Sequence, residues 1–110
     1  MREMRLYLLQ RATAALLAPL ILVHLVVIYI ATGHGLTAAD VLARTRGSLA
    51  WGAFYGLFVV LAAVHAGIGV RAIAREWTPL PAAARDMAMW VTGLLLVVLG
   101  LRAVLAVVGP

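Results

Sequence analysis

A histidine, two glycines and an arginine follow one another closely near the end of a long apolar segment, in the run His65-Ala-Gly-Ile-Gly-Val-Arg71. An imidazole inside a membrane span is costly, and such a residue is a functional-site hypothesis by default. Gly67 and Gly69 remove side-chain bulk beside the ring, and Arg71 places a fixed positive charge about two turns away. Because neutral imidazole is a common axial ligand of haem iron, the run predicts a site for a flat, iron-bearing ligand with carboxylate tails. The alternative is a neutral histidine that bonds a neighbouring backbone carbonyl.

Two further histidines have different surroundings. Counted from the nearest arginine at 1.5 Å per residue, His65 lies about 9 Å deep and His24 about 20 Å deep. One iron needs both axial nitrogens at one level, so each ring requires a ligand from another chain or a second copy. His24 has its own alternative, a bond to the carbonyl that Pro19 frees one turn earlier. His34 lies between two glycines and is expected to be solvated.

The composition predicts the element type that must position these side chains. The chain has 110 residues, of which 65% are hydrophobic and 12% charged, a profile typical of a membrane protein. A helix needs about 20 apolar residues to cross the hydrocarbon core. We therefore expect an all-α membrane protein, a single domain over residues 1–110, with three transmembrane helices at roughly 12–31, 49–70 and 87–108.

Two polar breaks separate the three spans. The first span ends at Thr32-Gly33-His34-Gly35, and the second ends at Thr78-Pro79-Leu80-Pro81, where proline cannot continue a helix. Between the first two spans, Thr37-Ala-Ala-Asp40 has the spacing of a capping box and predicts a short interfacial helix.

The arginines predict the orientation of the chain. Six lie at one membrane edge (Arg2, Arg5, Arg11, Arg71, Arg75 and Arg85) and three at the other (Arg44, Arg46 and Arg102). The positive-inside rule then places the N-terminus and the second loop in the cytoplasm and the C-terminus outside. This distribution explains the net charge of +5 better than nucleic-acid binding does.

Several kinds of chemistry are excluded by the residues present. The chain has no cysteine, so it forms no disulfide and supplies no thiolate to a metal or cluster. It also has no Ser-His-Asp set, phosphate-binding loop or paired carboxylates. We therefore expect it to be non-catalytic alone. The first span is too long for a signal peptide and is expected to be retained.

Aromatic and small residues have interfacial or packing interpretations. Trp77 and Trp90 at one edge, and Trp51 and Tyr29 at the other, are typical of interfacial anchors. Glu76 lies three helical turns after His65 and shares its face; at the membrane edge it is expected to be solvated. Four glycines are expected to permit close helix contact: Gly52, Gly56, Gly93 and Gly100. Asp86 is expected to pair with Arg85 or to start the third helix.

Two motifs carry a resemblance to a known family. The run Leu8-Leu9-Gln10-Arg11-Ala12-Thr13-Ala14 is similar to an Arg-Ala-Thr-Ala start of a first anchor helix, and His65-Ala66-x-Ile68-Gly69 followed by Glu76-Trp77 and Pro79-Leu80 is similar to the end of a second. Over nearly its whole length the chain resembles the cytochrome b membrane-anchor subunits of succinate dehydrogenase. The His-x-x-x-Gly-x-Arg run of the larger anchor is also present, but that anchor's His-Arg-x-Ser-Gly motif is missing. The smaller, D-type anchor is therefore favoured.

The resemblance implies a set of roles. His65 would be an axial ligand of haem b, opposite a histidine of a second cytochrome b anchor subunit, with Gly69 beside the ring and Arg71 near a haem propionate. A quinone headgroup would lie near the cytoplasmic edge, close to Glu76 and Trp77. The family usually has tyrosine at the position of Trp77, and indole donates a hydrogen bond but cannot relay a proton as a phenol does.

Some relatives hold two haems, one near each face of the membrane. His24 then becomes a candidate ligand of a second, distal haem, and Arg102 either faces its propionates or snorkels to the interface. The resemblance leaves one haem and two haems open.

The expected function is a membrane-anchor subunit of succinate dehydrogenase or fumarate reductase in a bacterial cytoplasmic membrane. It would hold an iron–sulfur subunit and an FAD-containing flavoprotein subunit and would pass electrons between succinate and quinone. The alternatives are a haem-free structural membrane anchor and an unrelated small b-type cytochrome subunit.

Overall fold

The computed structural model describes residues 2–110, and within them the chain forms four helices and no strand. The helices are α1 (Arg2–Thr32), α2 (Ala38–Thr45), α3 (Leu49–Trp77) and α4 (Ala82–Val108). By length and composition α1, α3 and α4 can each cross a membrane. The predicted all-α fold with three candidate membrane spans is thereby confirmed.

The long helices continue past the apolar stretches that predicted them. The helix expected from residue 12 begins at Arg2, and the one expected to end at residue 70 continues to Trp77. The added segments contain arginine, leucine and glutamate, which favour a helix whether or not they are in lipid. The molecule is 49 Å long, so these charged ends extend beyond a hydrocarbon core of about 30 Å.

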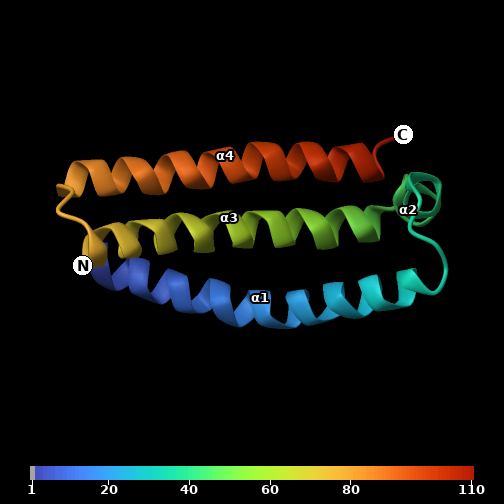
Figure 1. Ribbon diagram of the computed structural model, residues 1–110, viewed down its shortest axis with the longest axis horizontal. Helices are drawn as coiled ribbons and strands as arrows, with labels where there is room; N and C mark the ends of the chain where they lie inside the picture. Colours follow the sequence, from blue (N-terminus) through green and yellow to red (C-terminus); the bar gives the residue numbers. More distant parts are fainter. Residues whose placement is uncertain (1) are drawn as a thin grey trace.

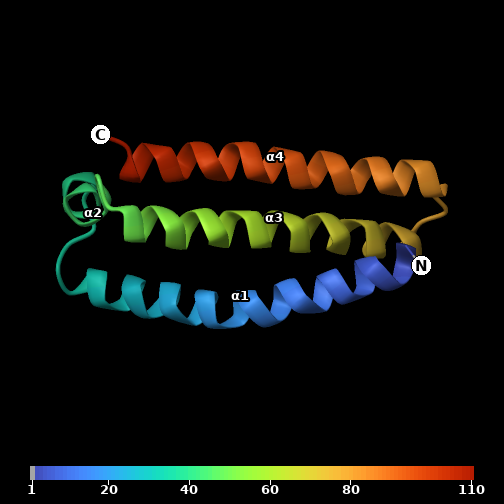
Figure 2. The ribbon, with the colours of Figure 1, turned by 180° about the vertical axis from the view of Figure 1, so that it is seen from behind.

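The three long helices run antiparallel, with α3 between α1 and α4 (Figures 1 and 2). The N-terminal end of α1 and the connection from α3 to α4 share one end of the bundle; below this is called the N-terminal end. The C-terminus and α2, which lies across the bundle, share the opposite end, called the α2 end. Because α3 contacts both neighbours, it is the element on which any site between helices must be built.

The contact between α3 and α4 depends on glycine. A methyl group built on Gly67 would lie 2.9 Å from the backbone oxygen of Met89 and 3.6 Å from the Cα atom of Gly93. Gly100 and Gly52 likewise lie against side chains of the facing helix, as expected for small residues in a membrane bundle. Gly56 differs, since nothing lies within 4 Å of the methyl position, and the expected close contact there is wrong.

Helix α1 is bowed, and its middle section carries Pro19 (Figures 1 and 2). A proline within a helix removes one backbone hydrogen bond and its ring pushes on the preceding turn. The bend lets the two ends of α1 approach α3 at different angles.

The predicted short helix α2 is present, with the predicted cap. The Thr37 hydroxyl accepts from the backbone N–H of Asp40, and the Asp40 carboxylate accepts from the Thr37 backbone N–H. Hydrogen bonds from Thr37 hold the pKa of the Asp40 carboxyl below its ordinary value. At its other end α2 is tied to α4, because the buried Thr45 hydroxyl lies 2.6 Å from the carbonyl oxygen of Val107. The cap and this tie fix α2 over one end of the bundle.

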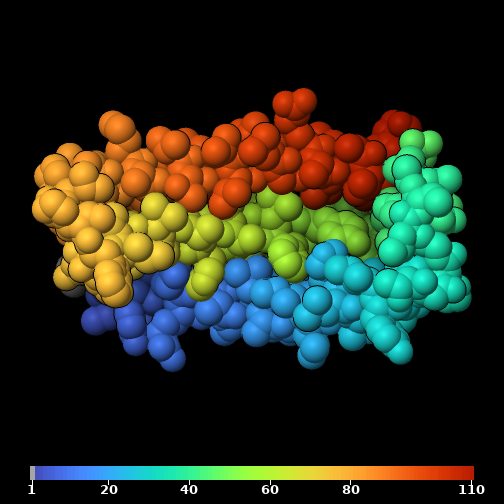
Figure 3. Space-filling model, in the orientation of Figure 1, coloured from blue at the N-terminus to red at the C-terminus, as the bar shows by residue number. Residues whose placement is uncertain are grey.

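Most large apolar side chains of α1 and α4 are exposed, and few residues are buried. Figure 3 shows the side chains of α3 exposed between α4 and α1 on one face. Such a surface suits lipid and further helices, since a water-exposed apolar surface of this extent would be unfavourable.

Candidate functional site

His65 is half-buried on α3 and faces α1. Its Nδ1 atom lies 3.1 Å from the hydroxyl oxygen of Thr13, a residue that is 3% exposed. The hydroxyl oxygen of Thr13 is also 2.9 Å from the carbonyl oxygen of Leu9 and 3.0 Å from that of Gln10, both in the preceding turn of α1. The two sequence motifs that carry the family resemblance therefore meet in space.

This contact bears on the alternative interpretation of His65. The ring nitrogen that contacts α1 is paired with a hydroxyl and not with a backbone carbonyl. The contact uses Nδ1 and leaves Nε2 for another partner. Among residues 2–110, no three His, Asp or Glu side chains are grouped as a metal site.

His24 lies at a different level of the bundle. Its ring packs edge-on against Tyr55 and Phe58, with ring centroids 5.8 and 5.6 Å away. His65 lies seven residues beyond Phe58 on α3, about 10 Å at the rise of an α-helix. The expectation that the two rings occupy different levels is confirmed, and they belong to separate sites.

A cavity of about 410 Å³ surrounds His24 at the α2 end of the bundle. The Nδ1 atom of His24 is buried and has no hydrogen-bond partner among residues 2–110, so this nitrogen does not bond the carbonyl freed by Pro19. Arg44 of α2 also lines the cavity; its guanidinium lies over the Trp51 ring, 5.5 Å from the centroid. The cavity thus combines an apolar lining with one free imidazole nitrogen and one cation.

Arg102 does not line this cavity, and its side chain is exposed. Arg44 is the cation among the residues that line the cavity with His24, and the sequence did not single it out for this site because it lies in a separate helix. His34 is exposed in the loop before α2, as expected.

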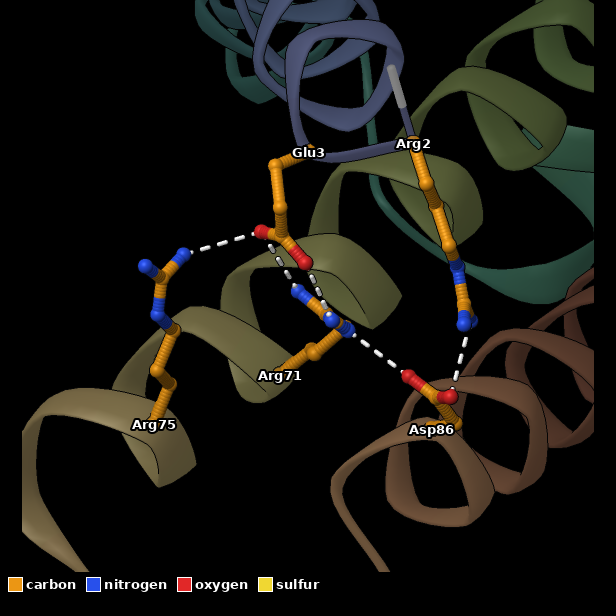
Figure 4. Close-up of polar contacts among 5 residues, drawn as sticks. All are labelled: Arg2, Glu3, Arg71, Arg75 and Asp86. Atoms are coloured by element: carbon orange, nitrogen blue, oxygen red, sulfur yellow. Dashed lines mark hydrogen bonds and ion pairs between the residues drawn. The ribbon is translucent and has the colours of Figure 1, made fainter. Parts of the chain in front are cut away.

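At the N-terminal end, Arg71 is 6% exposed and joins three helices (Figure 4). Its Nε atom donates to Asp86 of α4 at 2.8 Å, and its Nη2 atom donates to Glu3 of α1 at 2.7 Å. Arg75 donates to the same Glu3 carboxylate, and Arg2 pairs with Asp86 at 2.9 Å. Three guanidiniums and two carboxylates thus form one network, called the Arg71 cluster below.

The Arg71 cluster changes the interpretation of two residues. Asp86 pairs with Arg2 and Arg71, and the expected pair with Arg85 is not formed. Arg71 was predicted to lie near a ligand carboxylate, and its guanidinium is bonded to two carboxylates of its own chain. Its immediate role is to hold the ends of α1, α3 and α4 together, and an added carboxylate would have to share these donors.

A second cavity, of about 490 Å³, lies between α1 and α3 beside the Arg71 cluster. Gln10, Arg75 and Glu76 are among its lining residues. The side-chain oxygen of Gln10 is buried and has no hydrogen-bond partner among the described residues. The side-chain nitrogen of Gln10 is the nearest neighbour of Gly69, 3.4 Å from the methyl position there. This cavity is called the inner cavity, because it lies at the end predicted to face the cytoplasm. It places several polar groups next to an apolar wall.

The remaining predicted residues are distributed around these features. Gly67 packs on α4, so its bare surface is used by the helix contact and not by a ligand beside His65. Trp77 is 81% exposed at the end of α3 and does not line the inner cavity, although Glu76 does. Sequence reasoning missed Glu3 and Gln10; the signal for Glu3 was an acid at the same predicted membrane edge as Arg71 and Arg75.

Comparison with known proteins identifies one family. A family model described as succinate dehydrogenase/fumarate reductase transmembrane subunit matches residues 2–101. No curated protein and no solved structure matches the chain. The matched residues include α1, α2, α3 and most of α4, and therefore His65, Thr13 and every residue that lines the inner cavity.

Proposed function

The chain belongs to the family of succinate dehydrogenase/fumarate reductase transmembrane subunits, and from that premise we propose that it supplies one ligand of a haem b and one wall of a quinone site. The observation that carries this proposal is the contact of His65 with Thr13. Gln10 and Ile68, each three residues from one of these two side chains, line the inner cavity. The two sequence motifs thereby lie at one place in the bundle.

Three features of His65 support haem ligation. The ring is half-buried in an apolar helix, its Nδ1 atom is engaged, and its Nε2 atom is left for a ligand. A second cytochrome b anchor subunit would donate the opposite histidine, because His24 lies at another level of the bundle and His34 lies in the loop before α2. Haem b, when bound, accepts and passes single electrons. The protein's part is to hold the imidazole and exclude water.

The inner cavity supports a quinone site at the same end. A quinone is an apolar ring with two carbonyl oxygens, so it needs an apolar wall and hydrogen-bond donors. The Gln10 amide and the Arg75 guanidinium line the cavity and can donate, and the Glu76 carboxylate can take up or release a proton. Trp77 lies outside the lining, which favours its role as an interfacial anchor.

The cavity around His24, at the α2 end of the bundle, supports a second, distal haem as a separate candidate. His24 there has a buried nitrogen without a partner among residues 2–110, and Arg44 supplies a cation suited to a propionate. The number of haems per complex follows from whether this cavity is occupied.

The charge distribution supports the orientation and the partners. The arginine-rich N-terminal end would face the cytoplasm, where the iron–sulfur subunit and the FAD-containing flavoprotein subunit would dock. In this arrangement the inner cavity would lie between the iron–sulfur subunit, which delivers the electrons, and the hydrocarbon core of the membrane. The setting would be a bacterial cytoplasmic membrane.

The test is a spectrum of the purified complex with its haem-to-flavin ratio. This chain is expected to copurify with a flavoprotein and an iron–sulfur protein. The purified complex is expected to show the α-band of a b-type haem on reduction. Replacing His65→Ala is expected to abolish or shift that band, whereas the matched control His34→Ala leaves it unchanged. His24→Ala removes about half of the haem if two are bound. A complex without any b-type band would identify a haem-free anchor and overturn the proposal.

A further inference from the structure

We propose that Thr13 is a positioning residue that holds the His65 imidazole in the tautomer with its proton on Nδ1. The inference rests on the proposed ligation of haem by His65 and adds the group that prepares this ring for iron. A metal binds a ring nitrogen that carries a lone pair, and the hydrogen bond made by the other nitrogen decides which one that is.

The proton count at Thr13 carries the inference. A threonine hydroxyl has one proton to donate and two lone pairs to accept with. The Thr13 oxygen lies 2.9 and 3.0 Å from the carbonyls of Leu9 and Gln10 in its own helix. These oxygens can only accept, so the single proton of Thr13 is directed to them.

The His65 contact must then run the other way. With its proton committed, the Thr13 oxygen at 3.1 Å can only accept, and the Nδ1–H of His65 donates to it. A neutral imidazole has one N–H, so Nε2 keeps its lone pair. If Thr13 instead donated to His65, Nε2 would carry the proton and could not bind iron as a neutral ligand.

The burial of Thr13 and the tie between α1 and α3 favour this direction of the hydrogen bond. Thr13 is 3% exposed, so water does not compete for its hydroxyl. It sits on a helix that is tied to α3 at its start by the Arg71 cluster, which limits sliding of α1 past His65. A hydrogen bond to the ring nitrogen that does not bind the metal fixes the orientation of the ring and raises the basicity of the ligand.

The substitution Thr13→Val removes the hydroxyl and keeps the shape of the side chain. In the purified complex, haem affinity is expected to fall about 10- to 100-fold, the usual effect of losing such a partner. The midpoint potential of the remaining haem should rise, since a less basic imidazole stabilises oxidised iron less. Thr13→Ser keeps the hydroxyl and should restore both values.

Thr32→Val is the matched control. Thr32 is on the same helix, and its hydroxyl also bonds a carbonyl in the preceding turn, that of Tyr29, but it lies at the other end of the bundle. It should leave haem affinity and potential as in the wild type. If Thr13→Val prevents assembly, Thr13→Ala, which introduces no additional atom, is measured in its place.

The outcomes separate this inference from the proposed function. A wild-type complex without haem, or a haem unaffected by His65→Ala, would refute the proposed function. If haem is present and lost in His65→Ala, but Thr13→Val matches Thr13→Ser and Thr32→Val in affinity and potential, only the role of Thr13 is refuted.

Discussion

The backbone contact of α3 with α4 at Gly67 allows a sharp test of the fold, the substitution Gly67→Ala. The added methyl group would lie 2.9 Å from the backbone oxygen of Met89, whereas ordinary contact begins at 3.4 Å. The neighbouring atoms are backbone on both sides, since Gly93 lies at 3.6 Å, and backbone cannot rotate away as a side chain can. The two helices must therefore separate locally by about half an ångström, the difference between those two distances.

The expected magnitude follows from two opposing terms. Overpacking a close contact costs about 1–3 kcal/mol, and exchanging glycine for alanine within a helix contributes up to about 1 kcal/mol in the opposite direction. The net loss for Gly67→Ala is then about 0–3 kcal/mol. The matched control is Gly56→Ala on the same helix, where nothing lies within 4 Å. Because the helix-propensity term is common to both variants, their stabilities should differ by about 1–3 kcal/mol, with Gly56→Ala the more stable.

The assay is thermal unfolding of the purified complex in a mild detergent. The quantity measured is the temperature at which this chain is released from the complex. Gly67→Ala should dissociate at a lower temperature than wild type, and Gly56→Ala at the same or a higher temperature. If Gly67→Ala were as stable as Gly56→Ala, α3 and α4 would not be in contact through Gly67, and the helix pairing described above would be wrong.

Three further outcomes follow from the polar contacts. Arg71→Gln removes the buried donor shared by two carboxylates and should lower the yield of assembled complex more than Arg75→Gln does, since Arg75 is exposed. Immunoblots of membranes measure this yield, and equal yields would contradict the role of Arg71 in holding α1, α3 and α4 together. The pKa of Asp40 is lowered in the folded chain, so its contribution to the cap of α2 is present above the ordinary carboxyl pKa and is lost as the pH falls through the lowered value. The protection of the α2 amides, measured as hydrogen exchange relative to the intrinsic rate at each pH, should therefore fall in acid in the wild type and change little with pH in Asp40→Asn. Gln10→Leu should raise the KM for quinone with a smaller effect on succinate oxidation by an artificial acceptor, and an unchanged KM would place the quinone elsewhere.

The elements were predictable because their signals are local. Hydropathy over about 20 residues gives a span, the Pro-rich segment after Thr78 ends α3, and the spacing of Thr37 and Asp40 gives the cap of α2. Each of these features depends on neighbours within a few positions, and each was found in the structure. The extended helix ends were missed because charged residues stop a membrane span without stopping a helix.

The rotation of the helices was not predictable in the same way. A membrane helix is apolar on nearly all sides, so its pattern does not indicate which face meets a neighbour. Gly67 was therefore placed beside a ligand although it faces α4, and Gly56 was placed at a contact although it faces open space. The pair of Arg71 with Glu3 joins residues 68 positions apart, and no local pattern connects them.

The contacts of Glu3 and Thr13 on α1 explain why the half of the bundle at the N-terminal end differs from the half at the α2 end. Helix α4 is held to α3 along its length by glycine contacts, but the polar bonds of α1 to α3 are those of Glu3 and Thr13, both in the half that precedes Pro19. Beyond the proline, α1 makes no hydrogen bond to α3 among the described residues, and the cavity around His24 lies there. The half that holds His65 is thus fixed by directional bonds, which suits a ligand that must keep one geometry. The half that holds His24 is shaped by apolar contacts, which suits a site whose occupant supplies the missing polar partner.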